Sequence, residues 1–197
     1  AKTIDKEFLR KDEIDKLIEA DFSIPRLSQV RDVFIFSCYT GLAYVDVAKL
    51  KEDDIVIGMD GGRWIKVNRT KTKTLSSIPI LPVAEQIISK YASMINYENK
   101  LLPVYSNQKT NGYLKEIADL SGITKKLTFH MARHTFATTI TLSNGVPIES
   151  VSKMLGHKSL KTTQHYAKIL DIKLSEDMKK LRLRFENESK LFAKNIT

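Results

Sequence analysis

The chain has 197 residues, 42% of them hydrophobic and 28% charged, which excludes a disordered or low-complexity segment and fits one domain or two small ones. One cysteine, Cys38, excludes an internal disulfide framework and fits a reducing cytoplasm. The net charge of +9 favours a polyanionic partner, nucleic acid before an acidic membrane surface, and no apolar stretch is long enough to cross a bilayer.

The first third of the chain is predicted to be helical. Segment 11–20 places Ile14, Leu17 and Ile18 at helical spacing behind an acidic first turn. A strongly apolar helix is expected over 28–39, ended by Gly41, and a short helix over 43–50 follows it.

The pattern then changes to that of strands. Three short β-branched segments, 54–58, 63–70 and 76–80, are separated by Met-Asp-Gly-Gly and by Lys-Thr-Lys-Thr. Because the glycines tolerate positive φ, the first separator is a good hairpin turn. We predict a small three-stranded antiparallel sheet.

From Pro82 onward the pattern is helical again. Helices are expected over 82–95, near 112–122, from His130 to about Leu142, and over 147–156 and 160–169, followed by a basic amphipathic tail helix from about Ser175. The fold class is therefore α+β, mainly α-helical with a small three-stranded antiparallel sheet.

Two histidines lie in the first turns of the helix that begins at His130, and their spacing is compatible with a metal site. His130 and His134 are four residues apart, hence on one helical face, as in the zinc-protease pattern His-Glu-x-x-His. Met131 stands where that chemistry needs a carboxylate. His157 and His165 are the remaining ligand candidates, and we expect no metal.

A phosphate site is the competing chemistry. Arg133 lies one turn from His130, and its planar fork of donors suits phosphate oxygens. His157 follows Gly156, which lets the chain turn sharply, and Tyr166 is an oxygen nucleophile if its proton is removed. Taken singly, a His-x-x-Arg pair is more often solvated helix surface, and a lone tyrosine is more often a half-buried helix aromatic.

Together the motifs carry a family resemblance. The order His-x-x-Arg-His-Thr-Phe-Ala, Leu-Gly-His and a tyrosine nine residues later resembles the tyrosine recombinases, the phage integrase family. "FSCYTGLAYVDVAKLKEDDI" and "RTKTKTLSSIPILP" extend the resemblance to about 8–169. It implies an enzyme, a site-specific recombinase or integrase, that breaks and rejoins double-stranded DNA through a covalent 3′-phosphotyrosyl intermediate. It implies no metal or other cofactor, a tetramer on DNA, and a bacterial cytoplasmic protein associated with the nucleoid when acting.

The resemblance also implies the roles of the motif residues. Tyr166 is the nucleophile, while Arg133, His130 and His157 bind the phosphate, and His130 is a candidate acceptor of the tyrosine proton. His134 is expected to brace its helix and not to meet the phosphate.

The hairpin corresponds to the family's general-acid segment. Lys71 matches the family's lysine, and Lys73 competes with it because the register of a hairpin can slip. Contact with the DNA backbone is the simpler role for both lysines, and Lys158 and Arg69 are expected to contact DNA as well.

One departure from the family pattern bears on activity. The family has an arginine directly after Thr-Gly-Leu, where this chain has Ala43. Arg69 lies two residues before Lys71, and strand alternation would point both side chains the same way, so we propose it as the substitute. Integrases of Bacteroides-type mobile elements are similar in lacking that arginine. Asp46 occupies the place of an acid that supports the arginines.

The expected organisation is a catalytic domain over 1–170 and a tail helix over 171–197 that docks on a neighbouring protomer. The amino-terminal core-binding domain of the family is expected to lie outside this sequence. Two alternatives stay open: a DNA-binding module with degraded catalysis, which Ala43 motivates, and a type IB-like topoisomerase, which would use the same tyrosine chemistry.

Overall fold

The computed structural model describes residues 7–94 and 99–194. The helices are α1 (Lys11–Glu19), α2 (Pro25–Thr40), α3 (Tyr44–Val47), α4 (Pro82–Tyr91), α5 (Asn107–Leu120), α6 (Phe129–Thr135), α7 (Ile148–Met154) and α8 (Ala167–Lys194), and the strands are β1 (Ile55–Ile57), β2 (Arg63–Asn68) and β3 (Leu75–Pro79). Short 3-10 turns lie at Glu52–Asp54, Ala92–Met94, Leu142–Asn144, Leu160–Thr162 and Gln164–Tyr166, and a π-helix at Phe136–Thr141. The predicted fold class is confirmed.

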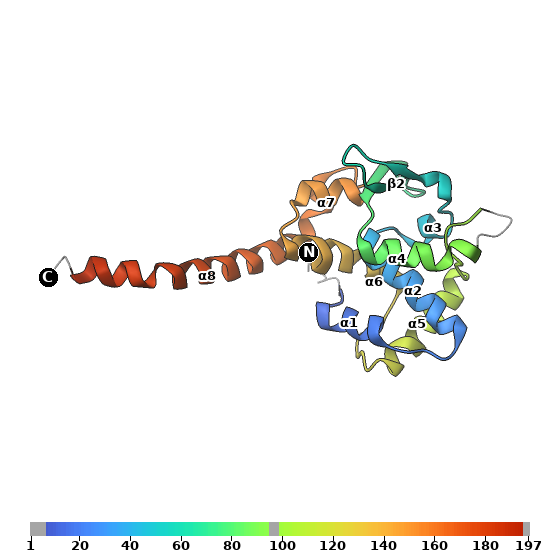
Figure 1. Cartoon of the computed structure of the whole chain (residues 1–197), viewed down its shortest axis with the longest axis horizontal. Helices are drawn as coiled ribbons and strands as arrows, with labels where there is room; N and C mark the ends of the chain where they lie inside the picture. The colour runs from blue at the N-terminus through green and yellow to red at the C-terminus, as the bar shows by residue number, and fades with distance from the viewer. Residues whose placement is uncertain (1–6, 95–98, 195–197) are drawn as a thin grey trace.

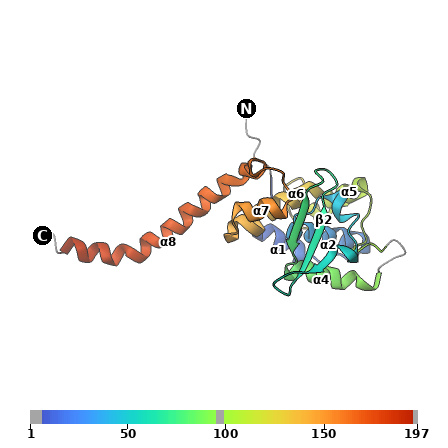
Figure 2. The same cartoon turned by 90° about the horizontal axis from the view of Figure 1, so that it is seen from above.

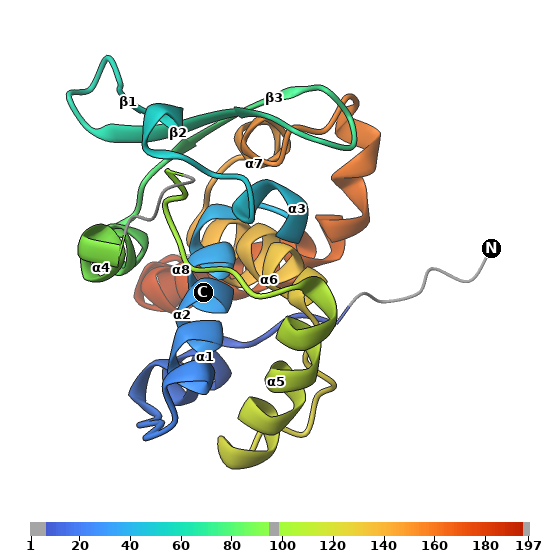
Figure 3. The same ribbon diagram turned by 90° about the vertical axis from the view of Figure 1, so that its right-hand side faces the viewer.

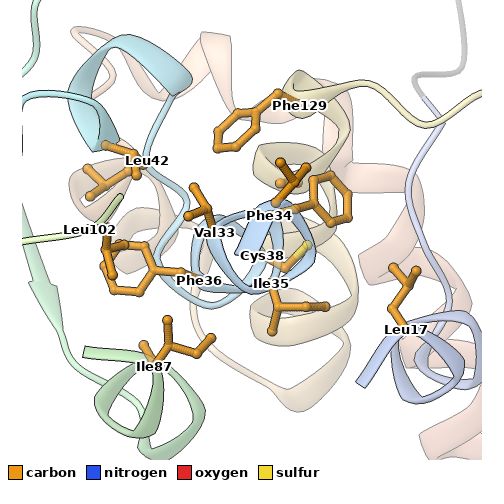
Figure 4. Packing of buried hydrophobic residues seen from close by; sticks show 14 of the residues in the cluster. Leu17, Val33, Phe34, Ile35, Phe36, Cys38, Leu42, Ile87, Leu102 and Phe129 are labelled. Atoms are coloured by element: carbon orange, nitrogen blue, oxygen red, sulfur yellow. The ribbon is translucent and has the colours of Figure 1, made fainter. Parts of the chain in front are cut away.

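Helix α2 is the centre of the core. Its second half, residues 33–38, is buried on every face, so this part of the helix is stable only when other elements surround it. Phe34 and Phe36 are fully buried on it, and Figure 4 shows Leu17, Ile87 and Phe129 meeting it from three other segments. Gly41 ends the helix in the left-handed region at φ +71°, as the sequence predicts.

The three strands form an antiparallel sheet in the order β1-β2-β3. The register pairs Ile65 with Ile78, and both are buried, because they point from the sheet onto the helices. The first hairpin turn is held by Asp60, whose carboxylate accepts bonds from the Trp64 indole and the Gly62 amide. Figure 3 shows the sheet along one side of the body, with α7 beneath β3.

The last helix, α8, projects far from the body (Figures 1 and 2). It begins at Ala167, eight residues before the predicted start near Ser175, because no glycine or proline interrupts the chain from 167 to 194. Leu181, Leu183 and Phe185 remain exposed on it. None of the helices in the described part of the chain has the length and apolar character needed to span a membrane.

Two predicted helices differ in form from the expectation. The helix expected from His130 to Leu142 turns into a π-helix at Phe136, where the Thr141 hydroxyl donates to the carbonyls of Phe136 and Ala137. Threonines that bond to preceding carbonyls compete with the α-helical ladder. The helix expected over 160–169 is two 3-10 turns up to Tyr166, capped at their start by the Ser159 hydroxyl.

Candidate active site

Arg133 lies inside the protein and bonds to two backbone carbonyls. Its guanidinium donates to the Gly41 carbonyl at 2.6 Å and to the Leu155 carbonyl at 2.5 Å. Gly41 has two reasons to be glycine: its positive φ, and a Cβ that would stand 2.4 Å from Phe136 Cδ1. The end of α2 and the end of α7 therefore fix the orientation of the arginine fork.

Arg69 lies beside Arg133 on the same carbonyl. Its Nη1 donates to the Leu155 carbonyl at 3.1 Å, and its Nε donates to Asp46 Oδ2 at 3.2 Å. The other Asp46 oxygen accepts the Thr70 amide at 2.8 Å. Asp46, which has no arginine neighbour at Ala43, thus has Arg69 as its partner, and two guanidinium groups converge on one backbone oxygen.

Strand alternation, the basis for predicting Arg69 as the substitute, is wrong for this segment. Strand β2 ends at Asn68, so Arg69 and Lys71 do not alternate along a strand but lie in the turn that follows. Arg69 is buried and Lys71 is exposed. Arg69 reaches Arg133 because the turn folds back over the end of α7, where the Thr72 hydroxyl donates to the Gly156 carbonyl at 3.3 Å.

Gly156 makes that close approach possible. It adopts φ +59°, and a Cβ there would stand 2.5 Å from Ser76 Oγ and 2.7 Å from Arg69 Cδ. The amide of His157 donates back to the Ser152 carbonyl at 3.1 Å, which closes the end of α7. The predicted turn at Gly156 is confirmed.

The two buried arginines create an excess of positive charge. Burial lowers the pKa of Arg133 to about 9, and the charge of Arg69 acts in the same direction. Arg133 is still charged at neutral pH, and Asp46 balances one of the two charges. An anion that enters this site would relieve the remaining repulsion, so the arrangement suits a negatively charged group such as a phosphate.

Tyr166 packs into a second, smaller apolar cluster with Phe136, Val151 and Leu155. It is only 5% exposed, and its hydroxyl lies 2.5 Å from Nδ1 of His134 in a hydrogen bond. Burial raises the pKa of Tyr166 to about 12, while the charge of Arg133 lowers it by a smaller amount. The hydroxyl is therefore protonated at neutral pH.

His157 is oriented by a residue that the sequence motifs did not indicate. Its Nδ1 lies 2.7 Å from the Thr163 hydroxyl, and Thr163 is fully buried. If the threonine hydroxyl donates, the neutral ring carries its proton on Nε2, and that nitrogen can donate to a phosphate oxygen. Thr163 lies between the two 3-10 turns, three residues before Tyr166, so a single short segment carries both groups.

The remaining predicted residues lie on the surface. Lys71 and Lys73 are exposed in the turn between β2 and β3, Lys158 is exposed after α7, and His130 is exposed on α6. The His130 and His134 rings meet edge to face at 4.6 Å between centroids. Among the side chains that the structure describes, no group of three or more from histidine, cysteine, aspartate or glutamate could hold a metal ion.

The family model described as the phage integrase family matches residues 7–172. The chain belongs to this family. Tyrosine recombinase XerD of Listeria innocua serovar 6a is 30% identical over 186 residues, which cover 89% of this chain and 62% of that protein. Tyrosine recombinase XerC of Rickettsia massiliae is 34% identical over 104 residues, 46% of this chain and 32% of the relative.

Solved structures agree with the family assignment. The XerA recombinase crystal structure superposes with a TM-score of 0.70 at 26% identity, over 89% of this chain and 65% of that one. The XerH recombinase bound to palindromic difH substrate, in its post-cleavage complex, has a TM-score of 0.71 at 18% identity, over 88% and 53%. This phage integrase family chain thus spans about three fifths of the length of the XerD proteins that it matches.

Proposed function

We propose that the chain is the catalytic domain of a site-specific tyrosine recombinase, an integrase that cleaves and rejoins double-stranded DNA through a 3′-phosphotyrosyl intermediate. The observation that carries the proposal is the convergence of Arg69 and Arg133 on the Leu155 carbonyl, because it builds a buried cationic site beside a buried tyrosine. Membership of the phage integrase family supports the same chemistry.

The positions of these groups support the following reaction. Attack of the Tyr166 oxygen on a DNA phosphodiester collects negative charge on the non-bridging oxygens, and the two arginines are fixed in place before that charge develops. Thr163 orients His157 to donate a further bond. Lys71, on the exposed turn beside Gly156, would protonate the leaving 5′-oxygen. A second 5′-hydroxyl reverses the step, so no cofactor is required.

Arg69 takes the place of the family arginine that is replaced by Ala43. Its bond to Asp46 supports this role, since the acid that serves the arginines is paired with it. A chain with degraded catalysis has no reason to keep a second buried arginine beside Arg133. The resemblance to integrases of Bacteroides-type mobile elements rests on this same replacement, and the proposed setting is a bacterial mobile element.

Assembly is the second part of the proposal. Residues 1–170 act as the catalytic domain, and the tail over 171–197 docks on a neighbouring protomer in a tetramer on two DNA duplexes. The projection of α8 from the body, with Leu181, Leu183 and Phe185 exposed on it, supports a partner for the tail. Lys73 and Lys158 would contact the DNA backbone, and the protein would act in the bacterial cytoplasm on the nucleoid.

Covalent capture tests the activity on duplexes of any sequence. The protein is incubated with a random-sequence pool of duplexes nicked close to the strand break, so that a short 5′-hydroxyl fragment is lost and the adduct accumulates. We expect captured DNA with the wild type and with the control Tyr113→Phe, and none with Tyr166→Phe. An adduct that survives Tyr166→Phe would contradict the assignment, and relaxation of a plasmid that lacks the captured sequence would favour a topoisomerase.

A further inference from the structure

The family resemblance predicts only a bracing role for His134, yet its ring nitrogen forms a hydrogen bond with the Tyr166 hydroxyl. Its Nδ1 and the Tyr166 hydroxyl lie 2.5 Å apart, and both side chains are buried, at 7% and 5% exposure. His130, the candidate for the tyrosine proton in the sequence, is exposed one helical turn away. Of the two histidines on α6, His134 is the one placed by the structure for a hydrogen bond with the Tyr166 hydroxyl.

We propose that His134 is a catalytic residue: its Nδ1 accepts the hydroxyl proton of Tyr166 as the tyrosine attacks the DNA phosphodiester. The inference rests on the proposed recombinase function and adds the group that activates its nucleophile. A neutral imidazole can accept at one nitrogen while it carries a proton on the other, so the phenol donates to Nδ1 without any rearrangement of the ring.

The step balances with groups already described. The bond from Tyr166 Oη to phosphorus forms, the bond from phosphorus to the 5′-oxygen breaks, and the phenol proton moves to Nδ1 of His134. The leaving 5′-oxygen takes a proton from the cationic Lys71. In the rejoining step the neutral lysine accepts the proton of the incoming 5′-hydroxyl, and His134 returns its proton to the phenolic oxygen, so both groups end in their starting forms.

The surroundings explain why an acceptor is needed. Tyr166 has a pKa of about 12 because it is buried, so only a minute fraction of it is ionised at neutral pH. The rings that face His134 are His130 from the same helix, His165 from the 3-10 turn, and Tyr166 itself. His134 is buried whereas His130 and His165 are exposed, so the proton accepted by His134 is held on a ring inside the protein.

A variant of His134 that keeps the hydrogen bond to Tyr166 but cannot accept a proton distinguishes a catalytic base from a residue that only braces the helix. Asparagine places an amide group where His134 has Nδ1, so His134→Asn preserves an acceptor for the phenol. The probe is a nicked duplex captured covalently by the wild type from the random pool. The measurements are the single-turnover rate of adduct formation from pH 7 to 9, duplex affinity by fluorescence anisotropy, and thermal unfolding.

We expect His134→Asn to bind the duplex like the wild type and to form adduct about 10²-fold more slowly at pH 7. Its rate should then rise about tenfold per pH unit, as hydroxide supplies the phenolate, while the wild-type rate rises much less. His134→Gln also lacks a basic nitrogen, so it should behave in the same way. It replaces the asparagine variant if that variant unfolds.

Two results would overturn the inference: a wild-type rate in His134→Asn at pH 7, or a reduced rate that stays flat up to pH 9. The first shows that a hydrogen bond is sufficient, and the second shows a structural defect. Absence of any adduct with the wild type is a different outcome, because it contradicts the recombinase function itself.

Discussion

The two sides of the active site are built differently. Arg69, Arg133 and Tyr166 are buried and bonded to protein groups, whereas Lys71 and Lys73 are exposed on a turn. Donors held in place before the reaction stabilise developing charge without reorganisation, whereas exposed lysines would be positioned only by the proposed DNA substrate. The buried side should therefore determine the rate of chemistry, and the exposed side should contribute more to binding, except at Lys71, the proposed general acid.

Loss of a buried cation should have the largest effect. Arg69→Ala removes one of the two guanidinium groups on the Leu155 carbonyl, and we expect adduct formation to slow by about 10²–10³-fold. Duplex affinity should fall less than tenfold. Lys66→Ala, an exposed cation on β2, is the matched control and should leave the cleavage rate unchanged. Equal losses of rate and affinity in Arg69→Ala would show that Arg69 only contacts the DNA backbone.

The two lysines of the exposed turn, Lys71 and Lys73, should differ in the step that each affects. Lys71→Ala should slow cleavage by about 10²-fold, because the 5′-oxygen then leaves without a proton. A duplex with sulfur in place of that 5′-oxygen needs no proton on the leaving group and should restore the rate. Lys73→Ala should weaken binding and show no such rescue. Rescue of Lys73→Ala instead would exchange the two assignments.

Thr163 lies between the two sides, since it is buried and yet orients the partly exposed His157. Thr163→Val keeps the shape but removes the hydroxyl from Nδ1, so the ring can adopt the tautomer that cannot donate through Nε2. We expect cleavage to slow by about tenfold with unchanged duplex affinity. Thr163→Ser should retain most of the activity, and equal losses in both variants would point to packing alone.

The smallest effect is on stability at high pH. The pKa of Tyr166 is higher in the folded chain than in the unfolded chain, so its contribution to stability is complete below about pH 10 and is lost as pH rises toward 12. Between pH 9 and 11, urea unfolding should show the wild type losing about 1 kcal/mol more than Tyr166→Phe. Parallel losses in the two proteins would show that the phenol is not buried in solution.

The features that could be predicted from the sequence are local. The apolar run of α2, the stop at Gly41, the three strands and the turn at Gly156 follow from residue patterns and backbone conformations that a few neighbours determine. The positions of Arg133 and His157 in the motif indicate phosphate chemistry, and Arg69 is a candidate because the family cation is missing at Ala43.

The features that escaped prediction depend on contacts distant in sequence. Arg69 is buried because the β2–β3 turn folds onto the end of α7, 86 residues along the chain at Leu155. His134 meets Tyr166 across 32 residues, and no periodicity marks that contact. The π-helix after Thr135 depends on where threonine hydroxyls find carbonyls. A helical wheel for residues 130–142 assumes a regular α-helix, so it cannot predict the π-helix that begins at Phe136.

The central claim is that Arg69 performs the role of the arginine missing at Ala43, and a swap tests it most directly. Ala43→Arg combined with Arg69→Ala returns a guanidinium to the family position, next to Asp46, whose carboxylate loses its partner in the single variant. We predict that adduct formation by the double variant on the captured duplex recovers to within about tenfold of the wild-type rate, well above Arg69→Ala alone. A double variant as slow as Arg69→Ala, with its fold and duplex affinity intact, would contradict the account.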